Sequence, residues 1–517
     1  MRKAICICLC LVMCLSLVCC KSGSKITSSD IENAEVSTQK NEEISLLYSS
    51  ADSLNPYTSA AKHNREVSHL LYDSLIVCDG DFNPVYKLAS KASLEGNVCT
   101  VKLRTAYFSD GSPVTAEDVL YSYNIAKKSD TVYAAELYEV ASVSASGSEI
   151  VFTLKNHDDY FLNLLDFPII KASSDGKKNS DGVEIAPIGA GRYYMADDTS
   201  TLLRHNNYYG EIGAVSKIKL IDAPDDISAT HYVEIGAADI YYADEALGNV
   251  VRMSGKRADV NTNNFVYIGI NSAYGQLSNS LLRYAISSAI NRTEICHSAY
   301  FDNATPASGY FNPGIKETSA VQTLKTVSDT QISVENLSKL GYNKMKDGYY
   351  CNDSGNHITL TLLVNSDNLS RVAAAKLIAS ECKQCGIEIN VIERSYPEYI
   401  SLLSSGGFQL YLGEIKVLNN MDLESLVVSG GSAAYGVSAG VVDENTGTAG
   451  NTVCGDMVYK YKKGECTLTD LAGAFLTEMP QIPVCYRKGM LFYTSRIKNK
   501  AKPSCSDIFF SFENYIF

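Results

Sequence analysis

Tryptophan is absent from this chain of 517 residues, although tyrosine occurs 34 times and phenylalanine 15 times. Any aromatic contact with a ligand must therefore come from Tyr or Phe. Histidine is also scarce, with seven residues and no H-x-x-x-H spacing, so no common metal-binding motif is visible. The pair Gly189 and Gly191 lacks the third glycine of a nucleotide-binding loop. These absences argue against an enzyme, and we expect neither a cofactor nor a bound metal.

Long apolar runs are also missing after the first twenty residues, because none approaches the roughly 20 residues that cross a bilayer. The first twenty residues begin with Arg2 and Lys3 and continue with an apolar run from Ala4 to Val18. A charged start before a short apolar region is typical of an export signal. Without Arg2 and Lys3 the chain keeps 43 basic and 58 acidic residues, a net charge near −15. This acidic balance argues against binding of nucleic acid.

The end of this signal, Leu17-Val18-Cys19-Cys20, resembles the bacterial lipobox. In that motif a cysteine after a small residue is lipidated and becomes the new N-terminus. The resemblance implies that residues 1–20 are a lipoprotein signal peptide, that Cys20 carries the lipid, and that the polar residues 21–40 form a flexible tether. The protein is then expected at the cell membrane, lipid-anchored on the extracytoplasmic side. A plain secretory signal cut near Cys19 and an uncleaved anchor are the alternatives.

Sixteen cysteines do not form an evident disulfide framework. Six lie in the signal, and the other ten are scattered from Cys78 to Cys505 without a repeated spacing. Cys382 and Cys385 form the one C-x-x-C, late in an expected helix and without a second ligand pair. We therefore expect buried free thiols.

Hydrophobic spacing predicts an α/β protein long enough for two or three packed domains. Strands are expected at 98–103, 149–154, 216–221, 358–364 and 387–392, and helices at 65–75, 115–127, 280–289 and 371–385. The order strand, helix, strand over residues 358–392 predicts a parallel or mixed sheet. Residues 429–452 are rich in Gly, Ala and Ser, and we expect a mobile loop there.

Three segments carry a more specific pattern. The first contains Leu71-Tyr72-Asp73-Ser74-Leu75 and ends in Phe108-Ser109-Asp110-Gly111-Ser112-Pro113-Val114-Thr115-Ala116-Glu117-Asp118-Val119. The others are Ile188-Gly189-Ala190-Gly191-Arg192-Tyr193 and, after Gly269-Ile270-Asn271, Ala289-Ile290-Asn291-Arg292. Together they resemble the extracellular solute-binding proteins of family 5, the oligopeptide-, dipeptide- and nickel-binding lipoproteins of ABC importers. Asp110, Asp118 and Arg104 in the first segment are expected to be turn, cap and core-pairing residues of the scaffold, not catalytic groups.

The resemblance implies a two-lobed α/β fold of the periplasmic-binding-protein type, class II, with a hinge between the lobes. Lobe one is expected to comprise residues 41–264 and 483–517, with an inserted subdomain at about 68–186, and lobe two residues 265–482. The implied function is to capture a small solute, with short peptides as the first choice, and to deliver it to the permease subunits of an ABC transporter as a monomer. A nickel chelate, a sugar, and a surface sensor or adhesin remain alternatives; a hydrolase is disfavoured.

The resemblance also implies candidate ligand-binding residues at the rim of the cleft. Lys62 belongs to a loop, Ser59 to His63, that matches the family segment lining the cleft, where a lysine could meet a ligand carboxylate. Tyr133 and Tyr486 match cleft aromatics.

A second set of candidates lies in residues 408–422, which match the strand and loop where the peptide binders keep an aspartate for the ligand's free amine. The candidates there are Tyr411, Glu414, Asn419 and Asp422. Asn419 stands at the position of that aspartate, and a neutral amide cannot form a charge-assisted pair with an ammonium. Capture of a peptide by its N-terminus is then expected only if Glu414 or Asp422 takes over the role. Otherwise Asn419 favours a non-peptide ligand.

Overall fold

The computed structural model describes residues 42–128, 132–180, 182, 184–246, 248, 251–428, 431–437 and 452–517. The expected signal peptide, Cys20 and the expected tether lie outside these residues, as does most of the expected loop at 429–452. In the part of the chain that is described, no helix combines the length and the apolar character needed to span a membrane.

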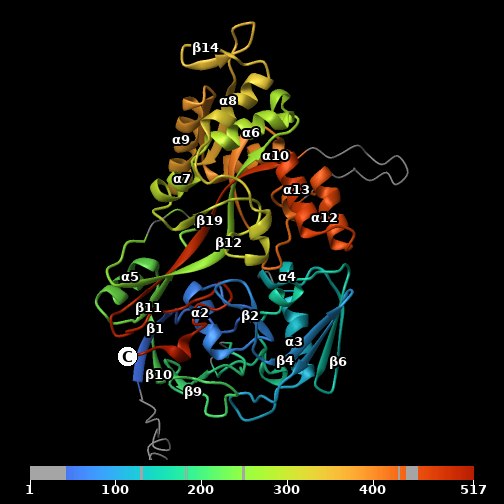
Figure 1. Cartoon of the computed structure of the whole chain (residues 1–517). Coiled ribbons are helices and arrows are strands. Elements are labelled where there is room, and N and C mark those ends of the chain that lie inside the picture. The colour runs from blue at the N-terminus through green and yellow to red at the C-terminus, as the bar shows by residue number, and fades with distance from the viewer. Residues whose placement is uncertain are drawn as a thin grey trace, which may run out of the picture. The chain divides into compact units, whose positions relative to one another are not determined.

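A mixed sheet, eleven-stranded among the described residues, is the largest element. Its two longest strands, β12 (Lys256–Ile270) and β19 (Gln481–Tyr493), pair antiparallel and run side by side through the protein (Figure 1). In spatial order the path is β17 (Glu388–Arg394), β16 (Thr359–Asn365), β18 (Leu410–Lys416), β12, β19, β11 (Ile240–Ala243), β1 (Glu42–Tyr48), β10 (Val215–Asp222), β9 (Thr201–Arg204) and β8 (Tyr193–Met195), with β13 (Ala304–Pro306) also paired to β19.

The two largest clusters of buried side chains draw on opposite ends of this strand pair. The largest core draws its residues from Ile44 to Val260 and from Leu491 to Tyr515. A second core draws its residues from Val266 to Cys485. One end of β12 and of β19 therefore packs in the first core and the other end in the second. This is expected of a two-lobed α/β protein in which each long strand supplies side chains to both lobes. The lobe limits at 264 and 483 remain predictions.

The part of the chain before β12 adds a four-stranded antiparallel sheet and several helices. The sheet has the order β4 (Ala89–Glu95), β5 (Val98–Leu103), β7 (Glu149–Leu154) and β6 (Val140–Ser146), and a small hairpin pairs β2 (Ile76–Cys78) with β3 (Pro84–Tyr86). The helices are α2 (Lys62–Leu71), α3 (Ala116–Ala126), α4 (Val132–Glu136) and α5 (Asp226–Glu234), and a 3₁₀ turn, η1, spans Phe161–Leu164.

The part between β12 and β19 is richer in helices. They are α6 (Ser280–Ala289), α7 (Arg292–Ser298), α8 (Thr330–Lys339), α9 (Leu369–Gln384), α10 (Tyr396–Ser405), α11 (Glu424–Val427), α12 (Val453–Lys462) and α13 (Leu468–Glu478), with a hairpin of β14 (Lys344–Lys346) and β15 (Tyr349–Cys351). Strands β16 and β17 pair in parallel on either side of α9. The parallel pairing predicted for residues 358–392 is therefore confirmed.

The signature segment around α3 is scaffold, as predicted. Thr115 and Asp118 form a capping box, in which the Asp118 N–H donates to Thr115 Oγ1 and the Thr115 N–H donates to Asp118 Oδ2. The other carboxylate oxygen of Asp118 accepts from the Ala172 N–H at 3.0 Å. Asp110 pairs with Lys171, and the Arg104 guanidinium lies 4.6 Å from the ring centre of Tyr209. These contacts turn, cap and fasten the chain.

Helix α2 begins three residues earlier and ends four residues earlier than the hydrophobic spacing indicated. Its start is fixed by Asp52, whose carboxylate accepts from the Ala60 and Ala61 N–H groups at 2.8 and 2.7 Å. Beyond its end, the Leu71 carbonyl accepts from the Gly191 N–H at 2.9 Å. A Cβ at Gly189 would lie 2.0 Å from that carbonyl oxygen, so the glycine is needed for this close approach. The Gly189-x-Gly191 motif is thus a packing motif.

Candidate functional site

A cavity of about 1130 Å³ lies where segments from distant parts of the sequence meet. Its walls come from the loop before α2, from α2, α3 and α4, from the turn after η1, from the end of β18, and from the C-terminal segment. Ligand pockets commonly measure about 300–1,000 Å³, so this cavity has room for a small solute together with water.

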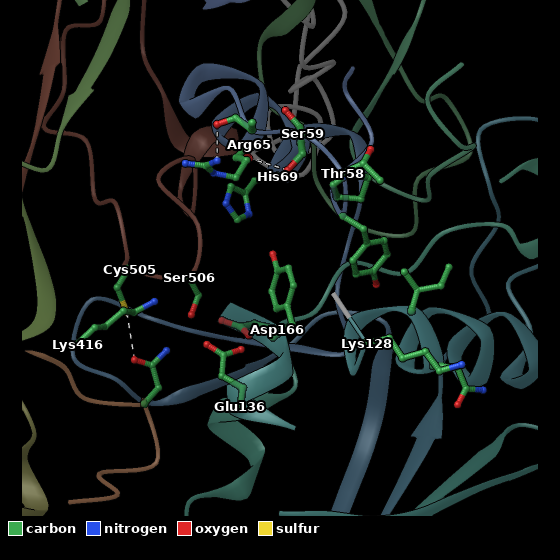
Figure 2. Close-up of a pocket in the computed structure, with 18 of the residues that line it drawn as sticks. Thr58, Ser59, Arg65, His69, Lys128, Glu136, Asp166, Lys416, Cys505 and Ser506 are labelled. Carbon is green, nitrogen blue, oxygen red and sulfur yellow. Dashed lines mark hydrogen bonds between the residues drawn. The ribbon is translucent and has the colours of Figure 1, made fainter. Parts of the chain in front are cut away.

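The first wall carries two basic groups on one face of α2. Arg65 and His69 are four residues apart and therefore lie on the same side of the helix, facing the cavity (Figure 2). The Arg65 guanidinium donates to the Ala60 carbonyl at 2.6 Å. Because Asp52 holds Ala60 from the other side, the loop before α2 and the arginine are fixed together.

An aromatic wall adjoins this face. Tyr57 and Tyr133 meet edge to face with their ring centres 6.0 Å apart, and both line the cavity. The Tyr57 hydroxyl donates to the Pro168 carbonyl, which fixes the ring. Tyr121 and the apolar side chain of Ile125 extend the wall along α3. Rings of this kind offer apolar contact area together with a polar edge.

The floor of the cavity is acidic. Glu136, the last residue of α4, and Asp166, in the turn after η1, lie beside one another, across the cavity from Arg65 and His69 (Figure 2). Glu136 is 4% exposed. Burial, together with the nearby charge of Asp166 and a hydrogen bond to it, raises the pKa of Glu136 well above its ordinary value. Glu136 Oε2 and Asp166 Oδ1 are buried, and neither accepts a hydrogen bond from any other group of the described residues.

The last wall joins the end of β18 to the C-terminal segment. It contains Lys416, Asn419, Cys505 and Ser506. The Asn419 carbonyl accepts from Asn163 Nδ2, and its Oδ1 accepts from Asn263 Nδ2, both at 3.1 Å. Asn419 therefore links strand β12 to the η1 turn at the edge of the cavity.

Two of the residues predicted from sequence, Tyr133 and Asn419, line this cavity. Lys62 does not, although its neighbours Ser59 and Ala60 do. The Lys62 ammonium instead donates to the Tyr242 carbonyl and lies 4.6 Å from the ring centre of Tyr241. The side chain of Lys62 thus lies against β11.

The two carboxylates proposed as substitutes for an aspartate at 419 lie outside the lining and are held in ion pairs. Glu414 Oε1 is 2.7 Å from the Arg487 guanidinium, and its Oε2 is 2.8 Å from that of Arg371. Burial alone would raise the pKa of Glu414, but the charges of the two arginines outweigh it and hold the pKa below its ordinary value. Asp422 Oδ2 is 2.8 Å from the Lys462 ammonium.

The remaining two predicted tyrosines are packed into a core away from the cavity. Tyr486 is 2% exposed, stacks on Phe265 with ring centres 5.0 Å apart, and donates to the Tyr310 carbonyl. Tyr411 is 1% exposed and donates to the Ala433 carbonyl at 3.1 Å. Their hydroxyls are satisfied by main-chain groups.

Sequence reasoning did not single out Glu136 or Asp166. Two signals were available. Glu136 follows Tyr133 by three residues, the spacing that places two side chains on one face of a helical turn. Asp166 is the one charged residue in the apolar run from Phe161 to Ile170, and charges in such runs are rarely buried without a role.

The cysteines are the remaining reactive groups of the chain. All ten cysteines from Cys78 to Cys505 are free, and eight of them are buried, which confirms the expectation of buried free thiols. Burial raises the pKa of the Cys505 thiol in the cavity wall to about 11. Across the described residues, no group of three or more His, Cys, Asp and Glu side chains is placed to hold a metal ion.

The chain is similar in sequence to known bacterial proteins. The chain is 23% identical over 351 residues to the nickel-binding periplasmic protein of Escherichia coli strain K12, which covers 62% of this chain and 66% of that protein. It is 22% identical over 411 residues to the oligopeptide-binding protein AppA of Bacillus subtilis, which covers 73% of this chain and 74% of that protein. The chain thus spans slightly less than two thirds of the length of the E. coli relative.

Solved structures show the same fold. The nickel ABC transporter protein from Bacillus halodurans superposes with a TM-score of 0.70 at 18% identity, over 89% of this chain and 96% of that one. Residues 83–432, more than half of the chain, match the family model described as bacterial extracellular solute-binding proteins, family 5 Middle. This agrees with the expectation of a binding protein and not an enzyme. The chain belongs to the bacterial extracellular solute-binding proteins of family 5.

Proposed function

We propose that this chain is the extracytoplasmic solute-binding lipoprotein of an ABC importer. It captures a small solute, with short peptides as the preferred cargo, and delivers it to the permease subunits in the membrane. The observation that carries this proposal is the cavity of about 1130 Å³ in a chain of family 5, with walls from α2–α4 and from the end of β18.

The character of the walls supports a peptide as cargo. Basic groups on α2 lie across from the acidic floor, and aromatic rings lie beside them. A short peptide at neutral pH carries a cation at one end and an anion at the other, with apolar side chains between. Relatives are named both as peptide-binding and as nickel-binding proteins. Nickel chelates are therefore the second candidate cargo, and a sugar the third.

Closure of two lobes around the cargo forms part of the proposal. Strands β12 and β19 are the crossings between the lobes, and their pairing has register shifts between Asn261 and Asn264 and between Val266 and Tyr267. Irregular pairing of this kind bends a strand locally. Asn419 accepts a hydrogen bond from Asn263, which lies within the first irregularity. A change in the bend of β12 would therefore move Asn419 in the cavity wall.

The cargo is tested with protein purified without refolding, by native mass spectrometry for a bound molecule. Calorimetric titration with tri-alanine, with the nickel–histidine complex and with glucose then ranks the three candidates. We expect micromolar or tighter binding of the peptide, and a smaller radius of gyration in solution scattering on saturation. Binding of the nickel complex without the peptide would contradict the peptide assignment. Binding without compaction would support a rigid surface sensor or adhesin.

Lipid anchoring at Cys20 is tested separately. The wild-type protein should be found in the membrane fraction with a diacylglycerol-modified Cys20 as its N-terminus, because two acyl signals hold a soluble domain stably on a bilayer. The Cys20→Ser variant should be released or left unprocessed. A Cys19→Ser variant is the matched control and should remain anchored. Full membrane attachment of an unprocessed wild-type chain would contradict a lipoprotein.

A further inference from the structure

We propose, building on the proposed role in solute capture, that Glu136 and Asp166 form the recognition point for a primary ammonium group of the cargo. The pair would take the ammonium of a ligand such as a peptide, from either its α-amine or a lysine side chain. This assigns cation recognition to α4 and the η1 turn, away from residues 408–422.

The first argument is the unmatched polarity of the floor. Glu136 is more than nine-tenths buried and lines the cavity, and Asp166 lines it beside Glu136. Glu136 Oε2 and Asp166 Oδ1 accept no hydrogen bond from any other group of the described residues. A buried acceptor without a donor destabilises a protein. Two neighbouring carboxyls with no partner but each other indicate a site for a donor from the ligand.

The second argument is the lack of a protein cation at the pair. Within the described residues, no Lys, Arg or His nitrogen lies within 4.0 Å of a carboxylate oxygen of Glu136 or Asp166, whereas Glu414 is paired with two arginines. Lys416 acts on Glu136 only as a more distant charge. A second cation is therefore needed to balance two adjacent carboxylates in their ionised form.

The third argument is shape and donor count. An ammonium is a compact cation with three N–H donors and no acceptor. The floor offers the neighbouring carboxyl groups of Glu136 and Asp166, and Ser506 lines the same cavity. An anionic group would be repelled there, and a neutral hydroxyl would leave the carboxylates uncompensated. The basic face of α2 lies across the cavity and suits the opposite end of a zwitterionic ligand.

Ammonium binding should release a proton. Without cargo, Glu136 holds its proton more tightly than an ordinary carboxyl, because burial and the neighbouring charge of Asp166 raise its pKa. An ammonium favours ionised Glu136, so the proton passes to the solvent, and affinity should rise as pH rises towards neutrality. The titratable and charged groups that line the cavity with the pair are Tyr57, Arg65, His69, Tyr121, Lys128, Tyr133, Lys416 and Cys505. The Cys78 thiol also lies near both carboxyls.

The test uses the full-length wild-type protein and three probes: tri-alanine, N-acetyl-tri-alanine, and N-acetyl-Ala-Lys-Ala. We expect the two probes with an ammonium to bind more tightly than N-acetyl-tri-alanine, and the tighter of the two identifies its source. In Glu136→Gln and in Asp166→Asn, affinity for that probe should fall about 10- to 100-fold, while affinity for N-acetyl-tri-alanine stays the same. Glu117→Gln, which removes an exposed charge on α3 outside the cavity, should bind as wild type.

Calorimetry in two buffers with different ionisation enthalpies measures the released proton directly. Release by wild type on binding the ammonium probe, and its loss in Glu136→Gln, support the inference. Equal binding of all three probes by wild type, or unchanged affinity in both variants, overturns the inference while leaving peptide capture intact. If no peptide binds, 1,5-diaminopentane serves as the ammonium probe. Its binding then supports the inference and contradicts a peptide cargo, and its failure to bind overturns the inference as well.

Discussion

Two buried glutamates, Glu414 on β18 and Glu136 on α4, meet opposite electrostatic surroundings. Both oxygens of Glu414 are taken up by Arg371 and Arg487, and the pKa of its carboxyl is held below the ordinary value despite burial. Glu136 has another carboxyl as its neighbour, and burial with that charge raises its pKa. Both residues are glutamates with little exposed side chain, yet the charge of Glu414 is balanced by two arginines and Glu136 has no basic partner within 4.0 Å among the described residues.

The difference separates a structural ion pair from a candidate binding group. A buried carboxylate with two arginines fastens β18, β19 and α9 together, and any ligand would have to displace an existing partner. A buried carboxyl that lines a cavity and has no basic partner can pair with a cationic ligand. Proteins tolerate such unmatched groups mainly at functional sites, where a ligand completes the interaction.

The largest expected effect on stability comes from breaking the ion pairs of Glu414 with Arg371 and Arg487. Arg487→Met removes the guanidinium that pairs with both Glu414 and Asp244, so that Arg371 alone remains to balance these two carboxylates. We expect the free energy of unfolding to fall by about 3–5 kcal/mol in urea denaturation at pH 7. Lys344→Met, which breaks an exposed pair with Asp353, should change it by no more than about 0.5 kcal/mol. Equal effects of the two substitutions would contradict a structural role for the Glu414 cluster.

The second prediction concerns a negative charge added to the wall of the cavity that contains Glu136. Asn419→Asp places a carboxylate in the cavity wall while its oxygen can still accept from Asn263. Binding of tri-alanine relative to its acetylated form should strengthen by about 1.5–3 kcal/mol, the size of hydrogen bonds to charged groups. Asn124→Asp, a matched substitution at the α3 wall, should give a smaller change. Calorimetry on both peptides checks this, and an equal gain for the acetylated form would count against charge pairing.

The smallest effect concerns the stability of Glu136→Gln. Since the folded-state pKa of Glu136 is raised, the folded protein holds this proton more tightly than the unfolded chain does. Wild type must therefore lose stability as pH rises above about 4.3, the ordinary pKa of Glu, up to the raised value. Glu136→Gln lacks this loss and should be at least as stable as wild type at pH 7. Urea denaturation between pH 4 and 8 measures the difference, and a clearly destabilised variant at pH 7 would assign Glu136 to the scaffold.

The elements that local patterns control were predictable from sequence. The helix Ser280–Ala289 has the predicted limits, and Thr115 caps α3 through Asp118 as expected. In both cases the determining residues lie within a few positions of one another. The limits of α2 were missed because Asp52 and Gly191, which fix its start and its end, come from outside its own hydrophobic pattern.

The candidate site was less accessible to sequence reasoning. Glu414 is acidic and close to Asn419 in sequence, but Arg371 and Arg487, which occupy it, are distant in the chain. Glu136 and Asp166 are thirty residues apart in sequence, and only the tertiary fold brings them together in one cavity wall. Tyr133 and Asn419, which line the cavity, were predicted from the positions that the family resemblance supplied. Whether a charged residue is matched depends on tertiary contacts.

The order of the strands has a consequence for how the fold is completed during synthesis. Strand β19 is the last strand in chain order, yet it lies between β12 and β11 in the large sheet. Until residues 481–493 have emerged, the sheet consists of two separate pieces, each with an unpaired edge of the kind that promotes aggregation. Contacts this distant in sequence also form slowly. Aggregation of the incomplete chain therefore has to be prevented until β19 has left the ribosome and paired with both β12 and β11.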